Sequence, residues 1–145
     1  MIGLIQRARH AWVDIDDTRA AEIDAGLVVL VCAVPDDTPE RATRLAERIL
    51  AYRVFGDDSG RMNIGVRDAG HAVLAVPQFT LAADTARGNR PGFSGACPPA
   101  RARGLFDDFV SALSARHEAV ATGRFGADMQ VGLVNDGPVT FWLTS

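Results

Sequence analysis

The first third of the chain has a hydrophobic pattern that predicts two strands followed by a helix. Residues 1–16 (MIGLIQRARHAWVDID) alternate between apolar and polar side chains, as in a strand with one buried face. A turn at residues 24–26 (DAG) precedes the apolar run 27–34, which predicts a buried strand. Thr38 and Pro39 then suit the cap and the first position of a helix.

Two segments repeat apolar side chains at the 3.6-residue period of an amphipathic helix. The helix that begins at Pro39 presents one apolar face, made of Ala42, Leu45, Ile49 and Tyr52. The second helix is predicted over residues 98–120, and its apolar stripe contains Leu105, Phe106, Phe109, Val110 and Leu113.

The remaining segments predict turns, a loop and two more stretches of strand. Residues 57–63 (DDSGRMN) suit a turn, and residues 72–81 (AVLAVPQFTL) suit a strand whose end is polar. Gly, Pro and Asn in residues 82–99 indicate a long loop, and residues 126–145 are strand material around a central Gly-Pro. Several strands with two amphipathic helices predict an α+β or layered α/β domain.

Composition narrows the class of protein. The 145 residues suit one domain, and 15 basic against 18 acidic residues give a net charge of −3. That charge argues against a DNA partner held over a wide face, but it permits a local contact with an RNA end. Two cysteines in unrelated contexts suggest reduced thiols. With no signal peptide and no apolar run of ~20 residues, we expect a soluble, cytoplasmic protein with no membrane partner.

The usual motifs of catalysis are missing from the chain. There is no GxSxG, no metal-ligand spacing such as CxxC or HExxH, and no phosphate-binding glycine motif. An enzyme built this way would rely on backbone groups or on its substrate for much of the chemistry.

Two stretches remain as candidates for a site. In residues 77–85 (PQFTLAADT), a strand end places an amide and a hydroxyl beside free backbone N–H groups, which can hold an oxyanion. In residues 135–140 (NDGPVT), a proline interrupts β-forming residues although it donates no backbone hydrogen bond. The alternatives are an ordinary strand end for the first stretch and a turn or a strand bulge for the second.

Taken together, these stretches resemble the D-aminoacyl-tRNA deacylase family. The shared pattern is QFTLAADTxRGxRPxFS followed by GxFxADMQVxLVNDGPVTFWL, with MIxLIQRxxxAxV at the start and RxAERILxYRxFxDxxGxMN over residues 44–63. The resemblance therefore covers the whole chain, residues 1–145. It implies an α/β fold, a compact single domain of mixed β-sheets with two main amphipathic helices.

The family resemblance also implies a function. Such proteins are homodimers that hydrolyse the ester between a D-amino acid and the 3′-terminal adenosine of tRNA, a proofreading reaction that needs no cofactor. Achiral glycine would leak through. Two alternatives stay open, a hydrolase of small D-aminoacyl esters and a non-catalytic module that binds the tRNA end.

By the same resemblance, residues 78–80 would carry the chemistry. The backbone N–H groups of Phe79 and Thr80 would hold the ester carbonyl oxygen, and Gln78 would orient the pocket. The Thr80 hydroxyl is a candidate nucleophile, but no base stands near it in the sequence. We instead expect attack by water, assisted by the 2′-hydroxyl of the tRNA itself.

Gly137-Pro138 would read the chirality of the substrate. The resemblance predicts a cis peptide bond here, whose two carbonyls point the same way and grip the α-ammonium group inside the partner subunit's pocket. An L side chain would then collide with the pocket wall or with these carbonyls, whereas a D side chain would point toward solvent. Arg7 would support the Gly-Pro segment.

Further residues of the pattern have two alternative roles or depart from the family. Phe125 and Met129 would pack against the terminal adenosine or belong to the core, and Arg87 and Arg90 would contact phosphates or solvent. Pro77 stands where the family usually has serine, which bears on how strictly L-substrates are rejected. Trp12 replaces a residue that is usually small.

Overall fold

A long central strand, β1 (Ile2–Ile15), organises the main sheet. The computed structural model describes residues 1–145. β1 pairs antiparallel along one edge with β8 (Gln130–Thr144). Along its other edge it pairs antiparallel with β3 (Gly26–Cys32) through its first half and with β2 (Thr18–Ile23) through its second half. Both edges of β1 are therefore occupied.

Parallel strands extend the sheet beyond β3. β6 (Ala72–Pro77) pairs in parallel with β3, and β7 (Val120–Thr122) pairs in parallel with β6. Hydrogen-bonded neighbours follow the order β2-β1-β3-β6-β7, in which β2 and β3 share one edge of β1, and β8 pairs with the other edge of β1. A separate small hairpin is formed by β4 (Phe55–Gly56) and β5 (Met62–Ile64) around the predicted turn. The sheet is mixed, and the predicted α/β class is confirmed.

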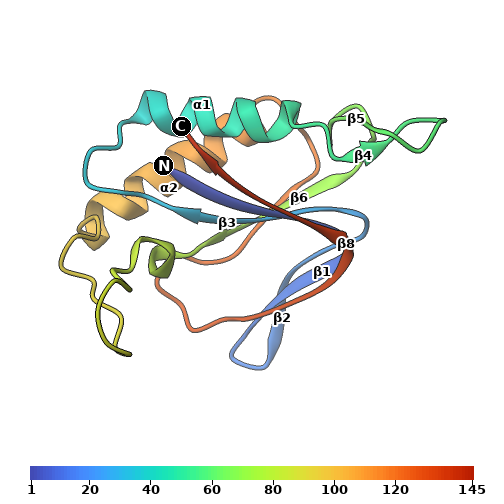
Figure 1. Cartoon of the computed structure of the whole chain (residues 1–145). Helices are drawn as coiled ribbons and strands as arrows, with labels where there is room; N and C mark the ends of the chain where they lie inside the picture. The colour runs from blue at the N-terminus through green and yellow to red at the C-terminus, as the bar shows by residue number, and fades with distance from the viewer.

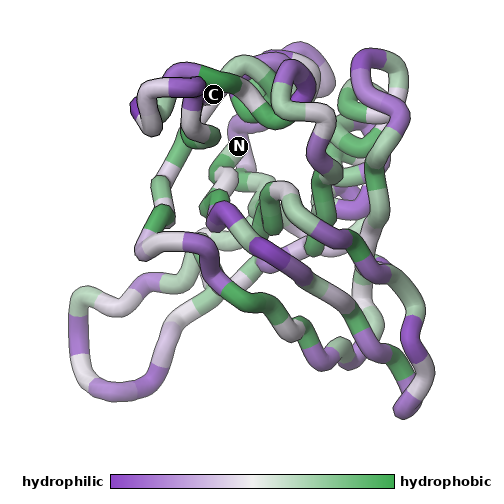
Figure 2. Tube along the Cα trace, turned by 90° about the vertical axis from the view of Figure 1, so that its right-hand side faces the viewer, coloured by the Kyte–Doolittle hydropathy of each residue, from purple (hydrophilic) through white to green (hydrophobic).

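Two helices, α1 (Pro39–Ala51) and α2 (Pro99–Ser114), lie side by side over one face of the sheet (Figure 1). The largest hydrophobic cluster lies between them and the sheet. Its fully buried members include Leu45 and Ile49 of α1, Phe109 and Leu113 of α2, and Ile5 of β1. The loops that project from the molecule are largely hydrophilic in Figure 2. No helix is long and apolar enough to span a membrane.

The predicted start of α1 is confirmed in detail. Thr38 accepts a hydrogen bond from Arg41 N through its side chain, and Pro39 occupies the first helical position. Ala42, Leu45 and Ile49 are buried as predicted, whereas Tyr52 lies just past the helix in an extended conformation.

The predicted end of the second helix is wrong. α2 stops at Ser114, and Val120, predicted as the last helical residue, instead begins β7. Pairing with β6 decides this, because Val120 and Thr122 lie opposite Val73 and Ala75 in the parallel ladder. The apolar stripe on α2 is otherwise as predicted, with Val110 half-buried.

The predicted strand over residues 72–81 is correct only as far as Pro77. A 3₁₀ turn, η1 (Phe79–Ala82), follows it. The parallel ladder ends with Pro77 opposite Val31, one residue before β3 itself ends at Cys32. Residues 83–98 form the expected loop, crossed by one bridge between Asp84 and Gly92.

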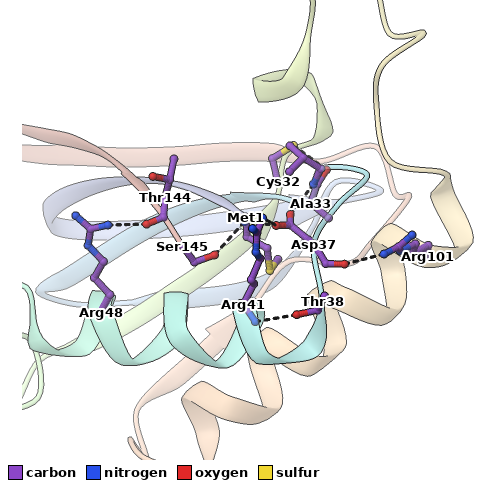
Figure 3. A network of polar contacts seen from close by, with 11 residues as sticks. Met1, Cys32, Ala33, Asp37, Thr38, Arg41, Arg48, Arg101, Thr144 and Ser145 are labelled. Carbon is purple, nitrogen blue, oxygen red and sulfur yellow. Dashed lines mark hydrogen bonds and ion pairs between the residues drawn. The ribbon is translucent and has the colours of Figure 1, made fainter.

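A buried carboxylate ties both ends of the chain to the turn before α1. Asp37 is fully buried, and it pairs with the α-ammonium group of Met1 and accepts a hydrogen bond from Val34 N at 2.7 Å (Figure 3). The Met1 ammonium also donates to Ser145 Oγ at 3.0 Å. Arg101 of α2 donates to the Asp37 carbonyl at 2.8 Å. Arg41 also pairs with Asp37 Oδ1 at 3.6 Å, whereas the buried Met1 ammonium pairs with no carboxylate other than Asp37. Loss of the Asp37 charge would therefore leave an unpaired buried ion.

We expect Asp37→Asn to lower the free energy of unfolding by about 3–5 kcal/mol, because the buried Met1 ammonium would lose its counter-ion. Urea unfolding followed by circular dichroism measures the loss. Asp36→Asn is the matched control: Asp36 is exposed, and its neutralisation should change stability by less than about 0.5 kcal/mol. Equal losses for the two variants would contradict the role assigned to the ion pair.

Candidate active site

A pocket of about 610 Å³ opens at the carboxyl ends of parallel strands β6 and β7. Three segments line it: Val76–Phe79 at the end of β6, Phe93 with Ala96–Pro99 and Ala102 around the start of α2, and Phe125–Met129 with Val131 between β7 and β8. Pockets in sheets with parallel strands commonly lie at this edge, because the segments that follow neighbouring strands converge there. Pro77, Gln78, Phe79, Phe125 and Met129, all predicted as site residues, meet in this one cavity.

The turn η1 presents main-chain donors next to the pocket. Gln78 N still bonds to Val31 O at 2.7 Å, which continues the pairing with β3. Leu81 is the first residue that donates within the turn, to Gln78 O at 3.3 Å. The N–H groups of Phe79 and Thr80 therefore precede the hydrogen bonds of the turn, as the first N–H groups of any helical turn do.

Side chains around η1 hold it in place. Gln78 Nε2 donates to Thr80 Oγ1, so the threonine hydroxyl is engaged with its neighbour, and Thr80 itself is not among the pocket-lining residues. Beneath the turn, Cys32 Sγ donates to Phe79 O at 3.6 Å. Burial raises the pKa of the Cys32 thiol, which keeps its proton on sulfur for that bond. The turn is thus anchored from both sides.

Aromatic and thioether side chains form the walls of the pocket. The Phe79 and Phe93 rings lie 5.2 Å apart, and 57% of Phe79 is exposed. Phe125 and Met129 are half-buried, and each packs on a hydrophobic cluster while it also lines the pocket. Their position agrees with partial membership of the core, and the contact with the terminal adenosine stays a prediction. A Cβ on Gly123 would lie 2.9 Å from Met129 Sδ, so glycine makes room for the thioether.

The Gly137-Pro138 segment lies elsewhere, on the β1 side of the sheet. Asn135 pairs with Ala8 and Thr140 pairs with Gln6, so residues 136–139 leave the ladder opposite Arg7. The peptide bond is cis, as predicted, and both residues are exposed. A Cβ on Gly137 would lie 2.0 Å from Val139 N and 2.7 Å from Asn135 Oδ1, which only glycine avoids. Neither residue lines the pocket of its own chain.

Arg7 and Asn135 hold this segment from below. Arg7 Nε donates to Asp136 O at 2.9 Å and pairs with Asp136 Oδ2 at 3.1 Å, while its other end donates to Val54 O. Asn135 Nδ2 donates to the carbonyls of Arg7 and Val139, at 3.1 and 3.3 Å. The hydrogen bond from Arg9, aided by the charge of Arg7, holds the pKa of Asp136 below its ordinary value, so Asp136 is charged at neutral pH.

Several lining residues carried no individual prediction. Phe93, Cys97, Pro98 and Asp128 come from the loop and the segment before β8. The family pattern contains Phe93 within RPxFS, and this was the one signal for it. Arg87 and Arg90 lie exposed in the loop that precedes α2. No three metal-ligating side chains gather anywhere in the chain.

A family model described as D-Tyr-tRNA(Tyr) deacylase matches residues 4–144. The chain belongs to this family. A protein of Herminiimonas arsenicoxydans named D-aminoacyl-tRNA deacylase is 57% identical over 143 residues, which cover 99% of this chain and 96% of that protein. One of the same name from Cronobacter sakazakii is 54% identical and covers 99% of each chain. The family resemblance predicted from the motifs is confirmed.

Two solved structures share the fold. One, named c-Myc DNA Unwinding Element Binding Protein, superposes with a TM-score of 0.94 at 36% identity, over 100% of this chain and 99% of that one. The other, described as a probable eukaryotic D-amino acid tRNA deacylase, has a TM-score of 0.86 at 14% identity and covers 99% and 98% of the two chains. At that identity the second match shows the fold alone.

From the contacts of Arg7 in this deacylase, we expect Arg7 to stabilise residues 136–139 more than Arg9 does. We expect Arg7→Ala to lower the free energy of unfolding by about 2–3 kcal/mol, because it removes charge-assisted bonds to two main-chain carbonyls and to Asp136. We also expect faster amide hydrogen exchange in residues 136–140. Urea unfolding and exchange mass spectrometry measure the two effects.

Arg9→Ala is the matched control for this experiment. Arg9 also pairs with Asp136, but its side chain is 77% exposed and bonds no main-chain atom of the segment. We expect a loss below about 0.5 kcal/mol and unchanged exchange. If Arg9→Ala loosened the segment as much as Arg7→Ala, the charge of Asp136 and not the main-chain anchoring would be responsible.

Proposed function

We propose that this protein hydrolyses the ester bond between a D-amino acid and the 3′-terminal adenosine of tRNA. Membership of the deacylase family over residues 4–144 is the observation that carries the proposal. The pocket supports it, because Gln78 and Phe79 of the QFT motif and Phe125 with Met129 line one cavity large enough for an aminoacylated nucleoside. The products are the free D-amino acid and a tRNA ready for recharging.

In this proposal the main chain stabilises the transition state. Attack on the ester carbonyl carbon places negative charge on its oxygen, and the N–H groups of Phe79 and Thr80 are the donors that receive it. The carbon–oxygen bond to the ribose then breaks, and the ribose oxygen leaves with a proton. Gln78, bonded to Thr80 through its side chain, keeps the turn in the required shape.

Water is the proposed nucleophile, with the 2′-hydroxyl of the tRNA as its helper. The Thr80 hydroxyl bonds to the Gln78 amide, which cannot take a proton, and no carboxylate or histidine bonds to it. A hydroxyl without a base is a weak nucleophile. The 2′-hydroxyl, in contrast, lies next to the reacting ester in every aminoacyl-tRNA.

Chirality is read, in this proposal, by the Gly137-Pro138 segment of a second copy of the chain. The two residues are exposed on their own chain and anchored by Arg7 and Asn135, as a probe for another surface would be. Val134 and Trp142 of β8 flank the segment and are 51% and 52% exposed, which supports burial against a partner. The carbonyls of Gly137 and Pro138 would bind the α-ammonium group, and Pro77 would lie at the pocket wall.

We expect D-Tyr-tRNA to be hydrolysed at least about 100-fold faster than L-Tyr-tRNA, because an L side chain meets the pocket wall or the Gly-Pro carbonyls. Glycyl-tRNA should be hydrolysed at a rate between the two, since it has no side chain to collide. The measurement is deacylation of matched D-, L- and glycyl-tRNAs under single turnover. Faster cleavage of the L-ester would disprove the chiral reading.

We expect Thr80→Val to keep deacylation of D-Tyr-tRNA within about tenfold of the wild-type rate, because valine preserves the shape and the N–H group while removing the hydroxyl. Single-turnover rates measure this. Loss of more than a thousandfold in a variant that still folds and binds tRNA would instead identify Thr80 as the nucleophile.

A further inference from the structure

Arg103 of α2 is held at the rim of the pocket by Phe125. Its guanidinium carbon lies 5.0 Å from the centre of the Phe125 ring, and Nη2 donates to Phe125 O at 3.2 Å. A Cβ on the next residue, Gly126, would lie 3.6 Å from the same Nη2. Since Phe125 and Gly126 both line the pocket, these contacts fix the arginine beside its opening.

The charge of Arg103 has no partner in the chain. Several other arginines pair with carboxylates, for example Arg7 with Asp136 and Arg116 with Glu47, whereas Arg103 forms no salt bridge. Its side chain is exposed, and one of its five N–H groups is used on Phe125 O. The remaining donors form a planar, permanently charged fork, the arrangement that suits a phosphate group.

We propose that Arg103 binds a phosphate of the tRNA 3′ end, the one attached to the ribose of the terminal adenosine. This inference rests on the proposed function, and it takes the terminal adenine to pack against Phe125, as the family resemblance implies. In a nucleotide the base and the 5′-phosphate are carried by one ribose, so a base on the Phe125 ring brings that phosphate to the rim where Arg103 lies. Arg103 therefore favours tRNA over small D-aminoacyl esters through binding, without taking part in bond breaking.

The test compares two substrates that differ in phosphate. D-Tyr-tRNA carries the phosphate, and 3′-O-D-tyrosyl-adenosine does not. Arg103→Gln removes the charge, Arg103→Lys keeps the charge, and Arg44→Gln removes one charge from the exposed side of α1, away from the pocket. KM and kcat are measured for each protein with each substrate.

We expect Arg103→Gln to raise KM for D-Tyr-tRNA about tenfold or more with kcat unchanged, because a charge-assisted hydrogen bond to phosphate is lost. KM for tyrosyl-adenosine should stay as in the wild type. The slope of log KM against log salt concentration should fall by about 0.7, the value for one phosphate contact with a single strand. Arg103→Lys should recover part of both effects, and Arg44→Gln should show neither.

Equal losses on both substrates would overturn the proposal, since Arg103 would then act only by positioning Phe125. No change on either substrate would overturn it as well. Binding of the trinucleotide CCA and of adenosine to unmodified protein, measured by calorimetry, separates this inference from the proposed function. If the wild type failed to hydrolyse D-Tyr-tRNA, weaker binding of CCA but not of adenosine by Arg103→Gln would still support the phosphate contact, and unaltered CCA binding would refute it.

Discussion

The pairing of β1 with β8 is the constraint on which the rest of the structure depends. β1 is paired along both edges, so its register with β8 cannot slip without moving every side chain to the wrong face. Between the pairs Gln6–Thr140 and Ala8–Asn135, β1 has one residue, Arg7, whereas β8 has four, so residues 136–139 have to leave the ladder. Pro138 sits where no ladder bond is required, so its missing N–H costs little, and side chains of Arg7 and Asn135 replace the lost strand pairing.

The same register explains the large residue at position 12. Trp12 lies directly opposite Gly132, and a Cβ on Gly132 would come within 2.1 Å of the indole ring. The ring therefore lies across the glycine, while the Arg19 guanidinium carbon lies 5.3 Å from its centre and His10 packs beside it. A large side chain is accommodated on one strand because its partner strand has none, so the two positions form a coupled pair.

The parallel part of the sheet supplies the other half of the proposed chemistry. There β6 ends at Pro77, and the chain closes into η1 with main-chain donors at the pocket. This pocket and the Gly137-Pro138 segment are in different parts of one chain, which is why the proposed chiral reading needs a second copy. The proposed roles divide accordingly: η1 acts on the ester, the Gly-Pro segment on the α-ammonium group, and Arg103 on the nucleic acid.

Local patterns in the sequence were enough for the start of α1, the apolar stripes of both helices and the family motifs. Thr38 with Pro39 and the 3.6-residue period depend on hydrogen bonds between near neighbours, which a short window of sequence contains. The family motifs also placed Phe79, Phe125 and Met129 among the site residues, and all three line the pocket at the ends of β6 and β7.

Tertiary structure alone decided the features that depend on distant partners. Residues 120–122 became a strand because β6 offered a free edge, and β6 stopped at Pro77, where the chain turns into η1. The ion pair of Met1 with Asp37 joins positions 36 residues apart, and Arg103 meets a carbonyl 22 residues further along the chain. The free energy of such contacts depends on where the whole chain brings the two groups, which no local pattern of residues encodes.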